Sequence, residues 1–133
     1  MAGETNINSL LKNMTPKLNE GEYVFCAVAS LAEIKPEDII GLFREAETIT
    51  VILNRHTADR LNLIYSYTAA WITLAVHSSL EAVGLTAAVS AALAENAISC
   101  NMVAAYHHDH IFVAHADAGK ALKVLEQLSA DVE

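Results

Sequence analysis

The sequence contains few basic residues and few cysteines, and each shortage excludes a class of protein. Eight lysine and arginine residues stand against sixteen aspartate and glutamate residues, giving a formal net charge of −8. Nucleic-acid affinity depends on clustered Lys and Arg, so a nucleic-acid partner is not expected. The two cysteines, Cys26 and Cys100, lie in separate apolar runs. Their separation excludes a zinc site of paired cysteines and predicts buried free thiols.

Long apolar runs are also missing, which argues against a membrane protein. The apolar run from Ala70 to Val76 is too short to cross a bilayer. The N-terminal sequence MAGETNINSLLKNM has no basic start followed by an apolar stretch and a cleavage site. We therefore expect a cytoplasmic protein with no membrane partner.

Catalytic motifs are missing as well. The sequence has no Gly-x-Ser-x-Gly, no glycine-rich phosphate loop and no His-Glu-x-x-His. Ser79 lies two residues from His77, but residues so spaced on a strand entering a turn seldom form a nucleophile and base. We expect a non-catalytic protein without a cofactor.

The composition is rich in apolar residues. Hydrophobic residues make up 53% of the 133 residues and charged residues only 18%. A chain of this length has little interior in which to bury so much apolar surface, so part of it is expected at a subunit interface. We predict a homodimer.

The chain is organised around residues 70–113. Ala70 to Val76 is typical of a central strand covered on both faces. Ser78, Ser79 and Glu81 offer capping side chains for a following helix, and Gly84 permits a sharp entry into it. The apolar face of this helix carries Leu85, Ala88, Val89, Ala92 and Leu93.

The helix is expected to end at Asn96 as a left-handed residue. Two strands, Ile98 to Ala104 and Ile111 to Ala114, then flank a polar hairpin at residues 106–110. Asp117 is a plausible N-cap for a last amphipathic helix.

The N-terminal half contains weaker signals. The patterns predict a helix at residues 5–14 stopped by Pro16, a strand at Tyr23–Val28, a connector at residues 30–38, a hairpin from Ile39 to Leu53 and a short helix at Arg55–Leu63. Arg44 beside Glu45 and Glu47 is most simply a solvated ion pair, with a ligand contact as the alternative.

A strand, a small-residue turn ending in glycine, an alanine-rich helix and a returning hairpin together resemble the ACT domain. The phrases ITLAVHSSLEAVGLTAAV, LAENAIS and YHHDHIFV are similar to those of small bacterial proteins with two tandem ACT-like modules. The resemblance covers the whole chain and is stronger in the C-terminal half. It implies a regulatory module that binds a small ligand, commonly an amino acid.

We therefore predict an α+β fold of two interleaved ferredoxin-like (βαββαβ, ACT-type) modules with antiparallel sheets. The divergent N-terminal module spans residues 1–67, with a connector in place of its first helix, and the C-terminal module spans residues 68–133. The last helix has no strand after it. The second module must lack its last strand or borrow one, and Tyr23–Val28 is the expected donor.

Two segments are candidate ligand sites. The turn contributes His77, Ser78, Ser79, Val83, Gly84 and Leu85, where peptide N–H groups at a helix start suit a carboxylate. The resemblance places the other wall at Ser99 and Asn101, often of another module. The hairpin adds Tyr106, His108, Asp109 and His110.

Three alternatives stay open. The turn serines can serve only as helix caps. The chain can be an oligomerisation module without a ligand. The histidines can bind a metal, although alternation in an extended segment lets His108 and His110 converge, or His107 and Asp109, but not all four.

Overall fold

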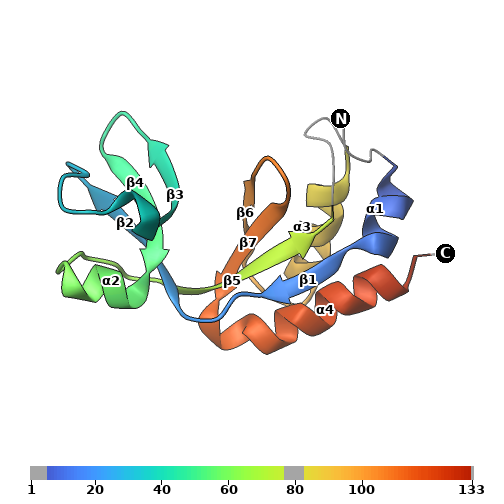
Figure 1. Ribbon diagram of the computed structural model, residues 1–133. Helices are drawn as coiled ribbons and strands as arrows, with labels where there is room; N and C mark the ends of the chain where they lie inside the picture. The colour runs from blue at the N-terminus through green and yellow to red at the C-terminus, as the bar shows by residue number, and fades with distance from the viewer. Residues whose placement is uncertain (1–5, 77–82, 133) are drawn as a thin grey trace. The chain divides into compact units, whose positions relative to one another are not determined.

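The computed structural model describes residues 6–76 and 83–132 and divides into two compact units (Figure 1). The central unit is Glu20–Ala69, and the terminal unit combines Met1–Asn19 with Ala70–Glu133. The ends of the chain thus belong to one unit, and the middle belongs to the other. This interleaving agrees with the expected fold class. Within the described ranges, no helix is long and apolar enough to cross a membrane.

The central unit is an antiparallel sheet covered by one short α-helix. Its strands are β2 (Tyr23–Val28), β3 (Ile39–Arg44) and β4 (Ile49–Asn54), in the order β3-β4-β2, followed by α2 (Arg55–Arg60). The connector between β2 and β3 holds only a 3₁₀ turn, η1 (Pro36–Asp38). The core of this unit consists of Val24, Cys26, Ile34, Val51, Leu53 and Ala58. Because β2 and β4 alternate, these side chains share the face that α2 covers.

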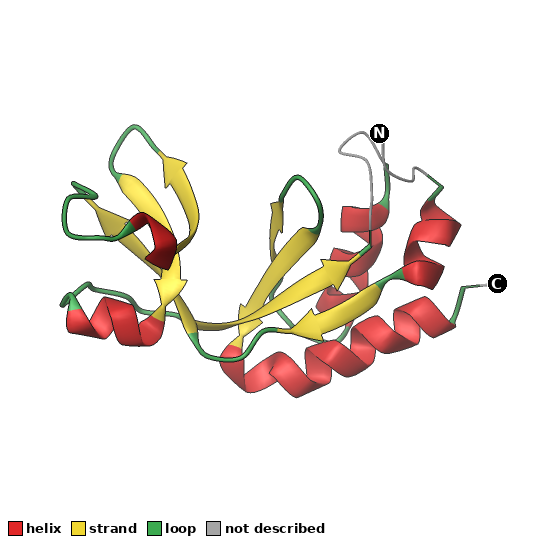
Figure 2. Ribbon diagram, viewed as in Figure 1, coloured by secondary structure: helices red, strands yellow, loops and turns green. Residues whose placement is uncertain are grey.

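The terminal unit has the ferredoxin-like sheet order β1-β5-β7-β6. Its strands are β1 (Thr15–Leu18), β5 (Thr68–Ala75), β6 (Asn101–Ala104) and β7 (Asp109–Ala114). Its helices are α1 (Ile7–Asn13), α3 (Leu85–Glu95) and α4 (Ala118–Ala130), with the 3₁₀ turn η2 (His115–Asp117) before α4. The first two residues of β5, Thr68 and Ala69, belong to the central unit and pair there with β2. Figure 2 shows strands and helices by colour.

The predicted donor of the missing strand was wrong. β1, not Tyr23–Val28, completes the terminal sheet, with Thr15 opposite Ala75 and Leu18 opposite Ile72. The Tyr23–Val28 strand instead pairs along its whole length with β4. Pro16 both stops α1 and lies within β1, where it is opposite Leu74. Proline is tolerated in β1 because β1 is an edge strand.

Alternation places one set of β5 and β7 side chains against the helices. Ile72 and Leu74 of β5 join Ile111 and Val113 of β7 in the core of the terminal unit. The helices add Leu85, Val89 and Leu93 of α3, Leu10 and Leu11 of α1, and Ala121 and Leu125 of α4 to this core. Of the apolar face predicted for α3, Leu85, Val89 and Leu93 are thus buried, whereas Ala88 and Ala92 are half-buried.

The end of α3 differs by one residue from the prediction. Asn96 has an ordinary φ of −105°, whereas Ala97 has a φ of 59° in the left-handed region. The Ile98 amide donates to the Leu93 carbonyl and the Ala97 amide to the Ala94 carbonyl, both at 3.0 Å. This is the Schellman arrangement, in which glycine usually occupies the left-handed position. The following strand, β6, begins only at Asn101.

Ala97→Gly is expected to raise the free energy of unfolding by about 1 kcal/mol, because glycine relieves the left-handed strain at this position. Ala94→Gly is the matched control, since Ala94 is also exposed but lies in the helical turn before the cap. It should lower stability by about 1 kcal/mol. Urea unfolding curves measure both, and shifts of the same sign in the two variants would contradict the prediction.

Candidate functional site

The start of α3 offers peptide N–H groups. Gly84 is the N-cap residue, with a φ of 105°, and it has no side chain with which to cap the helix. The first intrahelical bond runs from the Ala88 amide to the Gly84 carbonyl at 2.9 Å. The amides of residues 85–87 therefore have no acceptor within the helix, and they carry the positive end of its dipole.

The other predicted residues of this turn divide into three groups. His77, Ser78, Ser79 and the capping candidate Glu81 lie outside the described residues. Val83 is 83% exposed, so its side chain is available at the surface. Leu85 is buried in the core, so it can meet a ligand only through its backbone.

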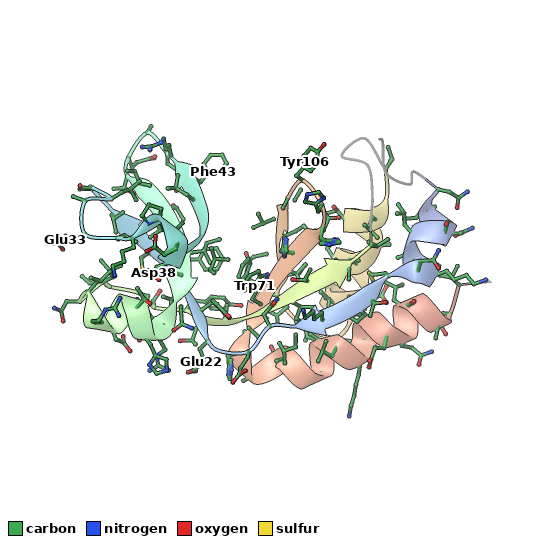
Figure 3. All side chains as sticks on the ribbon, viewed as in Figure 1. Glu22, Glu33, Asp38, Phe43, Trp71 and Tyr106 are labelled. Atoms are coloured by element: carbon green, nitrogen blue, oxygen red, sulfur yellow. The ribbon has the colours of Figure 1, made fainter. Side chains whose placement is uncertain are left out.

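The β6–β7 hairpin lies at the same end of the terminal unit as this turn (Figure 1). The turn of the hairpin is closed by the Ala105 amide, which donates to the His108 carbonyl at 3.0 Å. Tyr106 lies at the tip of the hairpin (Figure 3) and is 77% exposed. The His108 Nδ1 atom lies 3.4 Å from the carbonyl oxygen of Val76, just after β5. The hairpin thus meets the chain where it leaves the sheet toward α3.

The predicted alternation of the hairpin residues is present, but their secondary structure is not that of a loop. Asp109 and His110 are the first residues of β7, and Asp109 is opposite Ala104. Successive side chains on a strand point to opposite faces, so Asp109 shares its face with Ile111 while His110 shares its face with Phe112. The side chains of His110 and Asp109 therefore lie on opposite faces of the sheet.

His110 belongs to a hydrogen-bonded group on the sheet face opposite the helices. Trp71 Nε1 donates to His110 Nδ1 at 3.0 Å, and Thr73 Oγ1 lies 3.1 Å from the same nitrogen. Asn19 Nδ2 donates to Thr73 Oγ1 at 2.9 Å. Because the indole N–H can only donate, Nδ1 must accept, and the neutral ring carries its proton on Nε2. Sequence reasoning missed Trp71, Thr73 and Asn19, because nothing in the pattern shows that they meet His110.

Burial lowers the pKa of His110, and the neighbouring His108 lowers it further, while Asp109 acts in the opposite direction. Protonation at Nδ1 would also remove the acceptor of the Trp71 indole N–H. Both causes favour the neutral imidazole, so His110 titrates below the ordinary histidine value of about 6.5.

Trp71 is the only tryptophan in the sequence, so its fluorescence reports on this hydrogen bond. We expect an emission change on acidification whose midpoint lies below the ordinary histidine pKa. His110→Gln should abolish the transition, whereas His108→Gln should keep it and move its midpoint upward, because a positive neighbour has been removed. An unchanged transition in His110→Gln would assign it to another group.

Ser99 and Asn101 follow the C-terminal end of α3, whereas Gly84 is at its N-terminal end. Asn101 begins β6 opposite Phe112, and its Nδ2 lies 3.4 Å from the Phe112 carbonyl oxygen. β7 separates β6 from β5 in the sheet. Ser99 precedes β6 and is exposed. If Ser99 and Asn101 form a ligand site with Gly84, they must come from a second copy or another unit.

Two family models match the chain in tandem, and both describe an ACT domain. The first covers residues 2–70 and the second covers residues 66–127. The chain belongs to the ACT domain family. Family membership supports a regulatory module that binds a small molecule, and it indicates no catalytic family.

Solved structures with the same arrangement include a protein of unknown function from Vibrio cholerae, described as a possible transport protein. It is 44% identical, with a TM-score of 0.83 over 92% of this chain and 94% of that one. The regulatory subunit of aspartate kinase from Thermus thermophilus, in its ligand-free form, is 8% identical with a TM-score of 0.63, over 89% and 97% of the two chains. At that identity the likeness concerns the fold alone. No curated protein matches this chain.

The central ACT unit has a recess that sequence analysis did not anticipate. Its volume is about 470 Å³, and it is lined by the end of β2, the connector after β2 and the segment that follows α2. Its lining includes Ala27, Ala29, Ala32, Ile34, Leu63 and Ile64. The connector lacks an α-helix here, and the three alanines leave space beside larger apolar residues. In the sequence, the small side chains of Ala27, Ala29 and Ala32 are the feature that indicates this recess.

The predicted histidine metal site and the predicted Arg44 ion pair are not seen among the described residues. Among residues 6–76 and 83–132, no group of three or more His, Cys, Asp or Glu side chains is placed to hold a metal ion. The metal hypothesis stays a prediction, since His77 lies outside these ranges. The sequence predicts an ion pair of Arg44 with Glu45 or Glu47. Among the described residues, Arg44 forms no ion pair. Arginine pairs occur instead at Arg55 with Glu22 and Asp59, and at Arg60 with Asp38.

Proposed function

We propose that the terminal ACT unit binds a free amino acid at the start of α3, at an interface with another ACT unit, and that binding regulates a partner protein. The observation that supports this proposal is Gly84. It turns the chain into α3 without a capping side chain and leaves the first-turn amides for a ligand carboxylate.

The interface is proposed because the predicted second wall, Ser99 and Asn101, follows the C-terminal end of α3, whereas Gly84 is at its N-terminal end. A homodimer would bring a second copy of β6 to the turn. A ligand bound between two copies interacts with the assembled form only, and it therefore shifts the equilibrium between assemblies. This gives a non-catalytic protein a means of signalling.

The test is a screen of the twenty amino acids by thermal unfolding and calorimetry. A ligand that binds only the folded protein stabilises it by about 2.7 kcal/mol at a concentration one hundred times its dissociation constant. We expect one amino acid, or one chemical group of them, to raise the unfolding temperature. Silence from all twenty at millimolar concentration would reject the amino-acid proposal.

An oligomerisation module without a ligand is the second candidate, and the edge strand β3 supports it. β3 ends the sheet path of the central unit, and its Phe43 side chain is 71% exposed, with Ile40 and Leu42 also exposed. Exposed apolar edge strands invite pairing with another chain. If this edge carries the assembly, Phe43→Lys should convert the assembly to monomers in sedimentation experiments.

Ile64→Lys is the control for this experiment, because Ile64 is 90% exposed in the same unit but lies outside the strands. It should leave the assembly intact. Equal sedimentation of both variants and the native protein would exclude β3 as the contact. A Gly84 variant that loses ligand but keeps its assembly would favour the sensor over the second candidate.

A further inference from the structure

A row of three polar side chains crosses the face of the terminal sheet opposite the helices. Lys17 of β1 is directly opposite Thr73 of β5, so the two side chains share one face. Thr73 Oγ1 in turn lies 3.1 Å from His110 Nδ1 on β7. Ile72 and Leu74 alternate with Thr73 along β5 and belong to the core on the other face. The sheet itself therefore separates this Lys17–Thr73–His110 row from the core and from α3.

The orientation of the His110 ring is fixed by its neighbours. The Trp71 indole N–H and the Thr73 hydroxyl both reach the single lone pair of His110 Nδ1. Asn19 Nδ2 donates to Thr73 Oγ1 at 2.9 Å and to the Trp71 carbonyl oxygen at 3.2 Å, which holds both partners in place. Supporting hydrogen bonds of this kind select the tautomer and orientation of functional histidines. The ring thus presents Nε2–H as a donor.

The donors at the two ends of the row have no protein acceptor among residues 6–76 and 83–132. Within those ranges, His110 Nε2 forms no hydrogen bond and no buried side-chain nitrogen lacks a partner, so Nε2 is open to solvent. Lys17 is exposed and forms no ion pair with a described residue. Asn19, Trp71 and Thr73, which surround the ring, carry no negative charge. An ammonium group and an oriented N–H group are therefore available on one face.

We propose that the Lys17–Thr73–His110 row binds the carboxylate of a small organic acid, with His110 Nε2–H and the Lys17 ammonium as its donors. A carboxylate offers acceptor oxygens to both donors. One ammonium and one neutral imidazole balance a single negative charge, which favours a monocarboxylate over phosphate. Val103 of β6 is opposite His110 and 38% exposed, so it offers a contact for an apolar tail of the acid. This site is separate from the start of α3 and does not depend on the proposed function.

The competing explanation is that the row and its neighbours only fasten β5 to β7. NMR of the imidazole nitrogens separates the two explanations, with butyrate as the probe and butyramide as its uncharged counterpart. Native His110 should be the Nε2–H tautomer, and butyrate should shift its Nε2 signal with saturation. Butyramide should bind about tenfold more weakly, because it cannot form the charge-assisted bond with Lys17. An Nδ1–H tautomer, or no response to butyrate at high millimolar concentration, would overturn the inference.

Substitutions at the two ends of the row complete the test. Lys17→Gln should weaken butyrate binding about tenfold and leave the His110 tautomer unchanged. Lys12→Gln is the matched control, because Lys12 is exposed on α1 outside the row, and it should bind normally. Native butyrate affinity in Lys17→Gln would overturn the inference.

Trp71→Phe tests the positioning of the ring. It removes the indole N–H, so His110 should populate both tautomers and bind butyrate more weakly. A pure Nε2–H tautomer with native affinity in this variant would refute the role of Trp71. Gly84→Val should bind butyrate normally, because α3 covers the other face of the sheet. Loss of butyrate binding in Gly84→Val, with native binding in Lys17→Gln, would place the carboxylate at α3 and reject the site on the sheet.

Discussion

Leu125→Ala is expected to lower the free energy of unfolding of the terminal unit by about 2–5 kcal/mol. Leu125 is fully buried in the core shared by α1, α3, α4 and the sheet. Truncation removes its apolar contacts and leaves a cavity that rigid neighbours on several elements cannot fill. Trp71 lies on β5 of the same unit, so its fluorescence in urea follows this transition directly.

Ile64→Ala is the control for Leu125→Ala, because it removes the same number of carbon atoms from a side chain that is 90% exposed. Its effect should be smaller than about 0.5 kcal/mol. Comparable destabilisation by the two substitutions would mean that α4 is not packed as described. The Leu125 variant also shows whether the terminal unit unfolds cooperatively, since Trp71 fluorescence and far-ultraviolet circular dichroism should then give one midpoint.

Gly84→Val should destabilise the protein by about 1–3 kcal/mol, because a β-branched residue is strained at a positive φ. Space is not the limiting factor. A Cβ atom at this position would lie 3.6 Å from the Ile7 side chain, an ordinary contact. The same change should reduce amino-acid binding at least tenfold, because a residue that avoids φ of 105° reorients the first-turn amides of α3. Thermal unfolding and calorimetry measure the two effects.

Gly119→Val provides the matched control. Gly119 lies in the first turn of α4 and has no left-handed φ, and a Cβ atom added there would have no neighbour within 4 Å. Because valine and glycine differ little in helix propensity, the substitution should change stability by less than about 0.5 kcal/mol. Ligand binding should be native. If Gly84→Val binds the amino acid normally, the start of α3 is not the carboxylate site.

Most of the fold follows from patterns that depend on local chemistry. The 3.6-residue spacing of α3 places Leu85, Val89 and Leu93 in the core as predicted. β5 was expected to be covered on both faces, but Trp71, Thr73 and Ala75 on one face are only half-buried, whereas Ile72 and Leu74 on the other are buried. The helix predicted at residues 5–14 is present as α1, and Asn6 is its N-cap, with Oδ1 accepting from the Ser9 amide at 3.0 Å. These features are local, because each is decided by residues within one or two turns.

β1 and the Trp71–His110 group could not be found in the same way. The four residues of β1, Thr-Pro-Lys-Leu, show no strand alternation, and they become a strand only because β5 offers an unpaired edge. The hydrogen bond between Trp71 and His110 likewise depends on the pairing of β5 with β7. A single sequence does not encode such non-local register in a readable pattern. The alternation of the hairpin side chains is local by contrast, and the sequence predicts that Asp109 and His110 lie on opposite faces of the sheet, as they do.

The place of β1 in the sheet has a consequence for synthesis on the ribosome. Thr15–Leu18 emerge before the central unit, yet their partners at residues 72–75 emerge only after all of it. This early segment of the nascent chain must therefore wait, unpaired, while the central unit folds in the interval. A fragment cut at the boundaries of the second family match, residues 66–127, would lack this strand and expose an open β5 edge to aggregation.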